Sequence, residues 1–147
     1  FYGAGNNAAT YYVKAPTVGS NHIITVTGGI GTEVAFVCAS GSISTGGADQ
    51  SSDVRVTSTA SIQGTSVTPS NTNQIVISAI GTTTYGQTVS IDGGFTILEQ
   101  VNTDGNLGMA FAYLIQTTAA AANPTWTLTG GIPAGGGVVV NTTWKSH

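Results

Sequence analysis

The chain consists of short apolar segments separated by runs of Gly, Asn, Ser, Thr and Pro. Within several segments apolar and polar residues alternate, which is typical of half-buried β-strands. Thr, Val and Ile favour a pleated strand, and strong helix formers are scarce. The pattern predicts about ten strands, over residues 9–15, 22–27, 33–40, 53–59, 61–67, 74–81, 95–102, 107–117, 125–129 and 137–144.

These segments predict an all-β fold class, a single antiparallel β-sandwich of jelly-roll type with about nine to ten short strands. The length of 147 residues corresponds to one domain, and no internal repeat divides it. We therefore expect one domain over residues 1–147. Residues 41–52 are polar and are expected to form a loop.

The clearest predicted hairpin joins residues 95–101 to residues 109–115. The connection contains Asp104-Gly105, a dipeptide that favours tight hairpin turns. The second strand carries mostly large side chains on one face and mostly small ones on the other. We expect the large face to pack into the core and the small face to pack against another strand or subunit. The large residues are Met109, Phe111, Tyr113 and Ile115, and the opposite face carries Ala110, Ala112 and Leu114.

Charged residues make up only 6 % of the chain, whereas a soluble domain carries roughly 25 %. The basic residues Lys14, Arg55 and Lys145 form no patch, which excludes nucleic-acid binding by charge and a polybasic membrane anchor. No apolar stretch is long enough for a transmembrane helix. Gly, Thr, Ser and Asn together supply 67 of the 147 residues, so the surface is expected to be polar but weakly charged.

No set of residues predicts catalysis. The histidines are His22 and His147, and the sequence contains no Gly-x-Ser-x-Gly motif whose serine one of them could activate. The six carboxylates show no spacing that would place two of them across a cleft, as a glycosidase requires. The single cysteine, Cys38, lies in an apolar segment and is expected to be a small buried side chain. We therefore expect no enzyme and no cofactor.

Two motifs leave alternatives open. Asn102, Asp104 and Asn106 alternate oxygen-bearing side chains as calcium loops do, but they also suit an ordinary hairpin turn. No Gly and bidentate Glu follow at calcium-loop spacing, so we expect a turn and no metal. The triplet that begins at Asn141 matches an N-glycosylation acceptor, which requires Asn141 to face outward from its predicted strand.

The aromatic residues indicate both core and surface positions. Trp126 and Trp144 have apolar neighbours and are expected to pack in the core. Tyr11 and Tyr12 are consecutive in a predicted strand, so one ring points to each face and one of them is expected to be exposed. An exposed tyrosine is a candidate for contact with a sugar or with another subunit.

Four stretches have a familiar order between residues 9 and 145. They are Ile24-Thr-Val-Thr with Val34-Ala-Phe-Val and Asp49-Gln-Ser, Gly64-Thr-Ser-Val-Thr-Pro with Asn73-Gln-Ile-Val-Ile, Gly94-Phe-Thr-Ile-Leu, and Ala112-Tyr-Leu-Ile-Gln-Thr with Pro124-Thr-Trp-Thr-Leu and Val138–Trp144. This order resembles a β-sandwich domain of bacteriophage virion proteins and of exported bacterial proteins of poorly assigned function. The resemblance implies a location outside the cell or on a virion surface.

Members of that group have further strands before the segment that matches Tyr11-Tyr12-Val13. We expect either that a leader was cut off or that a neighbouring chain supplies the missing strand, because a sandwich without edge strands exposes backbone donors and acceptors. Residues 1–15 are then an intersubunit segment, with Phe1, Tyr2, Tyr11 and Tyr12 as its contact residues.

These observations favour a structural subunit whose partners are copies of itself. Mixed surface charge normally keeps isolated domains soluble, so a weakly charged surface suits a chain that copies of itself cover. We expect self-assembly into a virion appendage or extracellular filament through β-strand pairing and apolar contacts. The alternative is a carbohydrate-binding or adhesion module that recognises surface glycans.

Overall fold

The computed structural model describes residues 9–11, 23, 25, 27, 47–84, 86–101, 107–130 and 136–145. These residues contain eight β-strands and no helix. The strands are β1 (Ala48–Val56), β2 (Ser61–Gln63), β3 (Gln74–Thr82), β4 (Thr88–Ile91), β5 (Thr96–Val101), β6 (Gly108–Gln116), β7 (Thr125–Thr129) and β8 (Gly137–Trp144).

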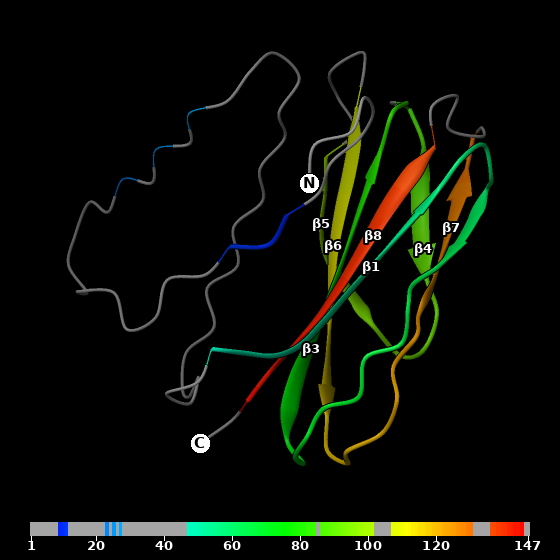
Figure 1. The fold of residues 1–147 in the computed structure, drawn as a ribbon. Coiled ribbons are helices and arrows are strands. Elements are labelled where there is room, and N and C mark those ends of the chain that lie inside the picture. The colour runs from blue at the N-terminus through cyan, green and yellow to red at the C-terminus, as the bar shows by residue number, and fades with distance from the viewer. Residues whose placement is uncertain are drawn as a thin grey trace.

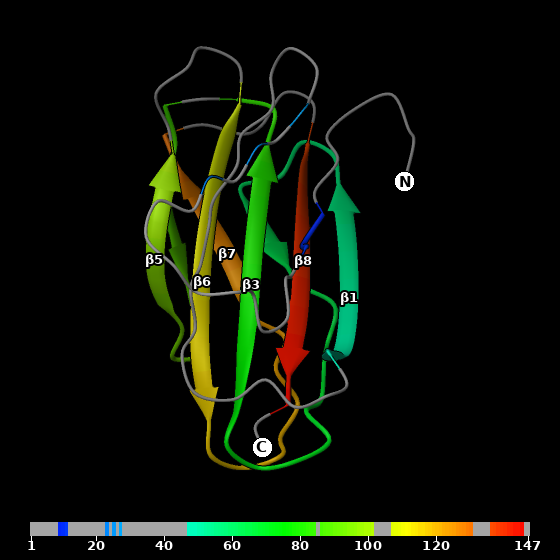
Figure 2. The same ribbon diagram turned by 90° about the vertical axis from the view of Figure 1, so that its left-hand side faces the viewer.

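The strands form two antiparallel sheets that face each other (Figure 1). A five-stranded sheet has the order β1-β8-β3-β6-β5, and Figure 2 shows these strands side by side with β7 behind them. A three-stranded sheet has the order β2-β7-β4. The all-β fold class with a sandwich of antiparallel sheets is confirmed.

Most strands beyond residue 53 were predicted closely. β7 and β8 have their predicted bounds, β3 is one residue longer at its end, and β5 and β6 are each one residue shorter at both ends. β2 covers only the first three residues of the predicted strand 61–67. The predicted strand 33–40 lies outside the described residues. Of the predicted strands 9–15 and 22–27, residues 9–11, 23, 25 and 27 are described and are not in strands.

Two predictions were wrong. β1 begins at Ala48, inside the segment predicted as a loop, because the chain from Gln50 onward pairs with β8. No large apolar residue occurs between Ala48 and Ser52, so alternation gave no signal there. β4 was missed because it has only four residues, and its pairing with β7 determines its conformation.

The predicted hairpin is confirmed, since β5 pairs with β6 in antiparallel register. The register shifts between Ile97 and Glu99, which places a β-bulge at Leu98. The turn at residues 102–106, with the calcium alternative, lies outside the described residues. The small face of β6 packs against another strand, as expected, since Ala110 and Ala112 lie in the core between the sheets with Trp126 of β7. On the large face the expectation holds for Phe111, which is buried in a second apolar cluster, but not for Ile115, which is 64 % exposed.

The core between the sheets is organised around Trp126 of β7, which is fully buried as predicted. Its indole Nε1 donates a hydrogen bond to Ser78 Oγ on β3 at 2.9 Å, so the polar atom of the ring is satisfied inside the core. The buried members of this cluster are Ile62, Ile80, Ala110, Ala112, Trp126, Leu128 and Val139. Because Trp126 occupies the space between the sheets, β6 accommodates alanine on this face.

Candidate functional site

The face of the five-stranded sheet that points away from the three-stranded sheet, called here the outer face, is apolar. Neighbouring strands place their outward residues in register, with Ile77 of β3 opposite Tyr113 of β6 and Thr142 of β8. Along β3, β6 and β8 the residues of this face are Ile75, Ile77, Ala79, Met109, Phe111, Tyr113, Ile115, Val138, Val140, Thr142 and Trp144. The large residues of β6 therefore belong to the outer face.

Three of these side chains form a buried cluster, called here the outer cluster. Ile77 and Phe111 are each 8 % exposed and Trp144 is 5 % exposed, and Ile75 and Ala79 pack against them. Trp144 Nε1 donates to Thr142 Oγ1 at 3.2 Å, so this indole is also satisfied. Trp144 is buried as expected, but it lies in a cluster separate from that of Trp126.

Other large apolar side chains are exposed. Ile115, at the end of β6, is 64 % exposed, and Leu98, in the bulge of the edge strand β5, is 46 % exposed. Tyr11 is 89 % exposed, which agrees with the prediction that one ring of the Tyr11-Tyr12 pair faces outward. Exposed large apolar residues of this kind are typical of interaction surfaces when they lie close together. Phe1, Tyr2 and Tyr12 lie outside the described residues.

At the β1 edge of the sandwich, side chains bridge the two sheets. Ser52 Oγ donates to Thr65 O at 2.7 Å, and Asn141 Nδ2 donates to the same carbonyl at 2.9 Å. Thr65 Oγ1 in turn donates to Asp53 O at 3.0 Å. The last of these bonds occupies a backbone carbonyl of β1, and the charges of Asp53 and Arg55 further protect this strand from pairing with another chain.

The opposite edge is bridged by one glutamine of β5. Gln100 Nε2 donates to Gln87 O at 2.5 Å, and Val89 N donates to Gln100 Oε1 at 3.5 Å. The side chain thus joins β5 to β4, which belongs to the other sheet. The register of both β1 and β5 shifts at one position, but only in β5 is the residue at the shift a large exposed apolar side chain, Leu98.

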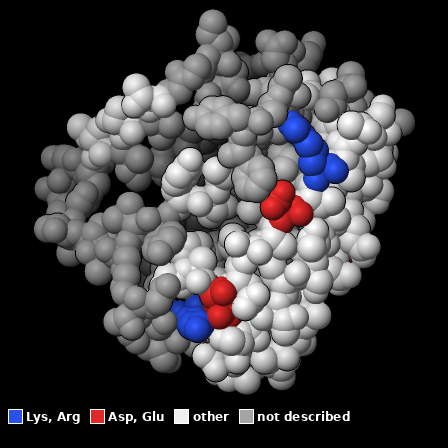
Figure 3. All heavy atoms as spheres, in the orientation of Figure 1, with Lys and Arg blue, Asp and Glu red and all other residues white. Residues whose placement is uncertain are grey.

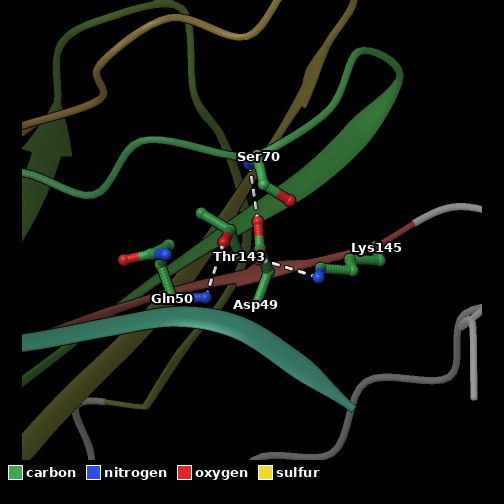
Figure 4. A network of polar contacts seen from close by, with 5 residues as sticks. All are labelled: Asp49, Gln50, Ser70, Thr143 and Lys145. Atoms are coloured by element: carbon green, nitrogen blue, oxygen red, sulfur yellow. Dashed lines mark hydrogen bonds and ion pairs between the residues drawn. The ribbon is translucent and has the colours of Figure 1, made fainter. Parts of the chain in front are cut away.

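Asp49 is the centre of a polar network (Figure 4). Its Oδ2 accepts from Ser70 N at 2.6 Å, and its Oδ1 lies 3.3 Å from Lys145 Nζ. With the Gln74 amide oriented to satisfy both of its atoms, its nitrogen donates to Asp49 Oδ2 at 3.2 Å and its oxygen accepts from Asn71 N at 3.0 Å. The network joins the start of β1, the segment before β3 and the end of β8.

The electrostatics of Asp49 indicate a structural role. The side chain is 4 % exposed, and this burial raises the pKa of the carboxyl. Hydrogen bonds from Ser70 and the charge of Lys145 act in the opposite direction and together lower the pKa below its ordinary value of 3.8. A carboxylate held in the charged form by several donors is a poor proton acceptor, so Asp49 ties three elements together.

A pocket of about 290 Å³ lies beside the turn between β4 and β5, and we call it the end pocket. Among its lining residues are one carboxylate, three amides and one aromatic ring: Asp92, Gln63, Gln116, Asn123 and Phe95. The lining residues come from four separate segments of the sequence. The sequence therefore did not predict that they lie together; it predicted only that residues 114–116 belong to a strand.

Two side chains of the end pocket are held in place by the backbone. Asp92 Oδ1 accepts from Thr125 N at 2.6 Å, and Asp92 N donates to Thr125 O at 3.2 Å. Gln116 Nε2 donates to Ala120 O at 2.8 Å, whereas the buried Gln116 Oε1 has no partner. The backbone thus fixes the positions of two polar side chains that line the pocket.

The glycosylation candidate Asn141 faces the interior. Asn141 is only 1 % exposed, and its Nδ2 donates a hydrogen bond to the carbonyl of Thr65. The outward orientation that a glycan requires is therefore not met, because the alternation of β8 directs Asn141 toward the three-stranded sheet.

The remaining candidates give no further site. Cys38, His22 and His147 lie outside the described residues. Among the residues that the structure describes, no group of three His, Cys, Asp or Glu side chains could hold a metal ion. The described residues likewise contain no helix long and apolar enough to span a membrane.

Comparison of the chain with models of known families, with curated proteins and with solved structures finds no match.

Proposed function

We propose that this protein is a non-enzymatic structural subunit that self-assembles into a virion appendage or an extracellular filament. The observation that carries the proposal is the exposure of large apolar side chains, chiefly Ile115, Leu98 and Tyr11. Burying such residues between copies removes apolar surface from water, at about 25 cal/mol per Å². Contacts between copies therefore stabilise an assembly without any chemical step.

The sparse charge of the surface supports the same proposal. In the view of Figure 3, the charged residues form two small groups in which opposite signs lie together, and most of the remaining described surface is uncharged. One of the pairs in the described part of the chain is Asp49 with Lys145. A surface without a large field of one sign does not repel copies of itself.

In this proposal residues 1–15 form the intersubunit arm, which adds a strand to a neighbouring copy. Strand addition uses backbone hydrogen bonds for affinity and side-chain pockets for specificity. The exposed ring of Tyr11 is available for such a pocket. With the added strand the sandwich of each subunit becomes a complete jelly roll, and the assembly is located outside the cell or on a virion surface.

Negative-stain imaging and light-scattering mass of the purified chain test the proposal. We expect filaments or arrays from the complete chain, and a folded species of about one subunit mass when residues 1–15 are deleted. A complete chain that is a monodisperse monomer at all concentrations contradicts self-assembly. Assembly that survives the deletion contradicts only the role of residues 1–15.

The end pocket favours carbohydrate binding as a second candidate function. Carbohydrates are recognised by amides and carboxylates that bond their hydroxyls and by aromatic rings that pack on their apolar faces. Gln63, Asp92, Asn123 and Phe95 supply these groups around one pocket. In this proposal the glycan contacts the end pocket, and not Tyr11 or Tyr12 as the sequence suggested.

A glycan array followed by titration of any ligand found tests the second function. We expect Asn123→Ala and Gln63→Ala to weaken binding, since both side chains line the pocket and neither belongs to the core. The matched control is Asn71→Ala, an exposed amide outside the pocket. Absence of binding across the array, or equal loss in the control, contradicts a glycan site here.

A further inference from the structure

Three polar side chains meet at the end of the five-stranded sheet where β3 begins and β8 ends. Ile75 of β3 pairs with Trp144 of β8. One further step of the antiparallel register places Gln74 opposite Lys145, the residue after β8. Directly opposed residues of neighbouring strands share a face, with Cβ atoms about 5 Å apart. The glutamine amide and the lysine amine therefore lie within reach of each other.

Asp49 contacts both of these side chains through one carboxylate. Its Oδ1 lies 3.3 Å from Lys145 Nζ (Figure 4), and its Oδ2 accepts from the amide nitrogen of Gln74 at 3.2 Å. The register of β1 shifts between Ala48 and Gln50, which places Asp49 in a β-bulge. Bulges redirect side chains and are frequent next to active sites. The two nitrogen atoms are thus held against a single carboxylate.

The amide of Gln74 is arranged as the acceptor in an amide exchange. Gln74 is fully buried, and its side-chain oxygen accepts a hydrogen bond from Asn71 N at 3.0 Å. A backbone N–H in this position stabilises the negative charge that develops on the oxygen when a nucleophile attacks the carbonyl carbon. The amine is reachable from water, since the Lys145 side chain is 38 % exposed. A nucleophile, an electrophile and a donor for the oxyanion therefore lie together.

We propose that Lys145 and Gln74 form an intramolecular isopeptide bond, which links the end of β8 to the start of β3. The lysine ammonium first loses a proton to water, because the charged Asp49 is a poor proton acceptor. The uncharged Nζ then attacks Cδ of Gln74, the Nζ–Cδ bond forms and the Cδ–Nε2 bond breaks. A second proton moves from Nζ to Nε2, so the products are a secondary amide and ammonia. No oxidant, reductant or cofactor takes part.

The proposed bond acts within one chain, so it does not depend on self-assembly. The 147 residues contain one cysteine, so no disulfide can form among them. A covalent link between distant residues, like a disulfide, stabilises a fold mainly by restricting the unfolded chain. The isopeptide bond would supply such a link and would hold β3 and β8 together even when the hydrogen bonds between them open.

Measurement of the intact mass of the complete chain tests the proposal. We expect a mass lower than that of the sequence by one ammonia, as purified or after incubation at mildly alkaline pH, where more of the amine is uncharged. Chymotrypsin cleaves after aromatic residues that lie between the two positions, among them Phe95 and Phe111. Its digest should contain a branched peptide that joins Gln74 to Lys145.

Lys145→Arg is the matched control, because arginine keeps a positive charge beside Asp49 and has no amine that can form this bond. This variant should retain the full mass. Asp49→Asn should slow bond formation about 100-fold, since misplacing reacting groups by about 1 Å costs roughly that much. Circular dichroism checks the fold of each variant. If Asp49→Asn does not fold, Lys145→Arg still tests the bond, because it changes only a partly exposed side chain.

Three results would overturn the proposal. The first is a full mass of the complete chain after prolonged alkaline incubation. The second is an equal mass loss in Lys145→Arg, which assigns the lost ammonia to ring closure at an asparagine. The third is a branched peptide that joins Lys145 to a residue other than Gln74. An unchanged rate in Asp49→Asn contradicts the role of the carboxylate.

Discussion

The two sheets differ in the face that each turns away from the other. In the three-stranded sheet, β7 alternates strictly: Trp126 and Leu128 are buried in the core, while Thr127 and Thr129 are exposed. In the five-stranded sheet both faces are apolar, and the outer cluster is as well buried as parts of the core. An alternating strand thus identifies a single buried face, whereas a nearly continuous apolar run identifies a strand with apolar side chains on both faces.

The same comparison applies within β6. Its small residues Ala110 and Ala112 face the space that Trp126 fills, and its larger residue Phe111 belongs to the outer cluster. Side-chain size therefore does not identify the inner face of a strand. The side chains of the two sheets together must fill the space between them, because protein interiors pack at nearly constant density. A large residue on one sheet is therefore matched by small residues on the other.

The largest effect is expected at the centre of the core between the sheets. Trp126→Ala should lower the free energy of unfolding by about 3–5 kcal/mol, because it leaves a large cavity and removes the partner of Ser78 Oγ. Thr127→Ala, on the exposed face of the same strand, should change it by less than about 0.5 kcal/mol. Urea denaturation measures both values. Similar losses for the two variants would contradict the conclusion that only one face of β7 packs in the core.

A second test overfills the small face of β6. Ala112→Leu adds volume where Ala112 is fully buried, and we expect a loss of about 1–3 kcal/mol in the free energy of unfolding. Tyr113→Leu serves as the control, because Tyr113 is the next residue of β6 and its side chain lies on the outer face. This substitution therefore adds no volume to the core between the sheets. A stabilising effect of Ala112→Leu would mean that the core has an unfilled cavity beside Trp126.

A third test concerns the polar network around Asp49, which joins the start of β1 to the segment before β3 and to the end of β8. Asp49→Ala should cost about 1–3 kcal/mol at neutral pH, since hydrogen bonds to a buried charged group are lost. Asp53→Ala, at an exposed carboxylate of the same strand, should have little effect.

The pH dependence of the same pair gives the sign of the effect. Because folding lowers the pKa of Asp49, its contribution is present above the ordinary value of 3.8 and is lost as the pH falls through the folded pKa. The difference in unfolding free energy between the unmodified chain and Asp49→Ala should therefore shrink in acid. A difference that stays constant from neutral to acid pH contradicts the charge-based role.

The smallest effect on stability is expected at the exposed end of the outer face. Ile115→Thr should change the free energy of unfolding by less than about 0.5 kcal/mol, because the side chain is mostly solvated. If copies contact this region, the same substitution should lower the assembled mass in light scattering. Thr117→Ser, an exposed residue just beyond β6, is the control. Unchanged assembly would remove Ile115 from the interface.

The sequence allowed the longer strands to be predicted and left their pairing open. The alternation of Thr125–Thr129 and the valine run of Gly137–Trp144 determine strands by themselves. The first residues of β1 are polar, so only their pairing with β8 makes them a strand. β4 is too short for a periodic signal and depends on β7.

The candidate sites were predicted less well, because they arise from tertiary neighbours. The burial of Trp144 followed from its apolar neighbours, but the sheet face on which it lies depends on register, which no local pattern contains. Asn141 was a plausible acceptor by motif, and the same register directs it inward. The end pocket unites residues from four segments, so it exists only once both sheets have formed.

The strand order has a consequence for how the chain folds. The central strand of the three-stranded sheet is β7, and β8 lies between β1 and β3, yet these two are the last of the eight strands along the chain. Among the described strands β1 pairs only with β8, and the bond from Gln50 N to Thr143 Oγ1 joins residues 93 positions apart. Proteins that depend on such distant contacts fold slowly. Before β7 and β8 pair, the earlier strands have unpaired edges that can associate with other chains. The yield of folded protein should therefore fall as the concentration of unfolded chain rises.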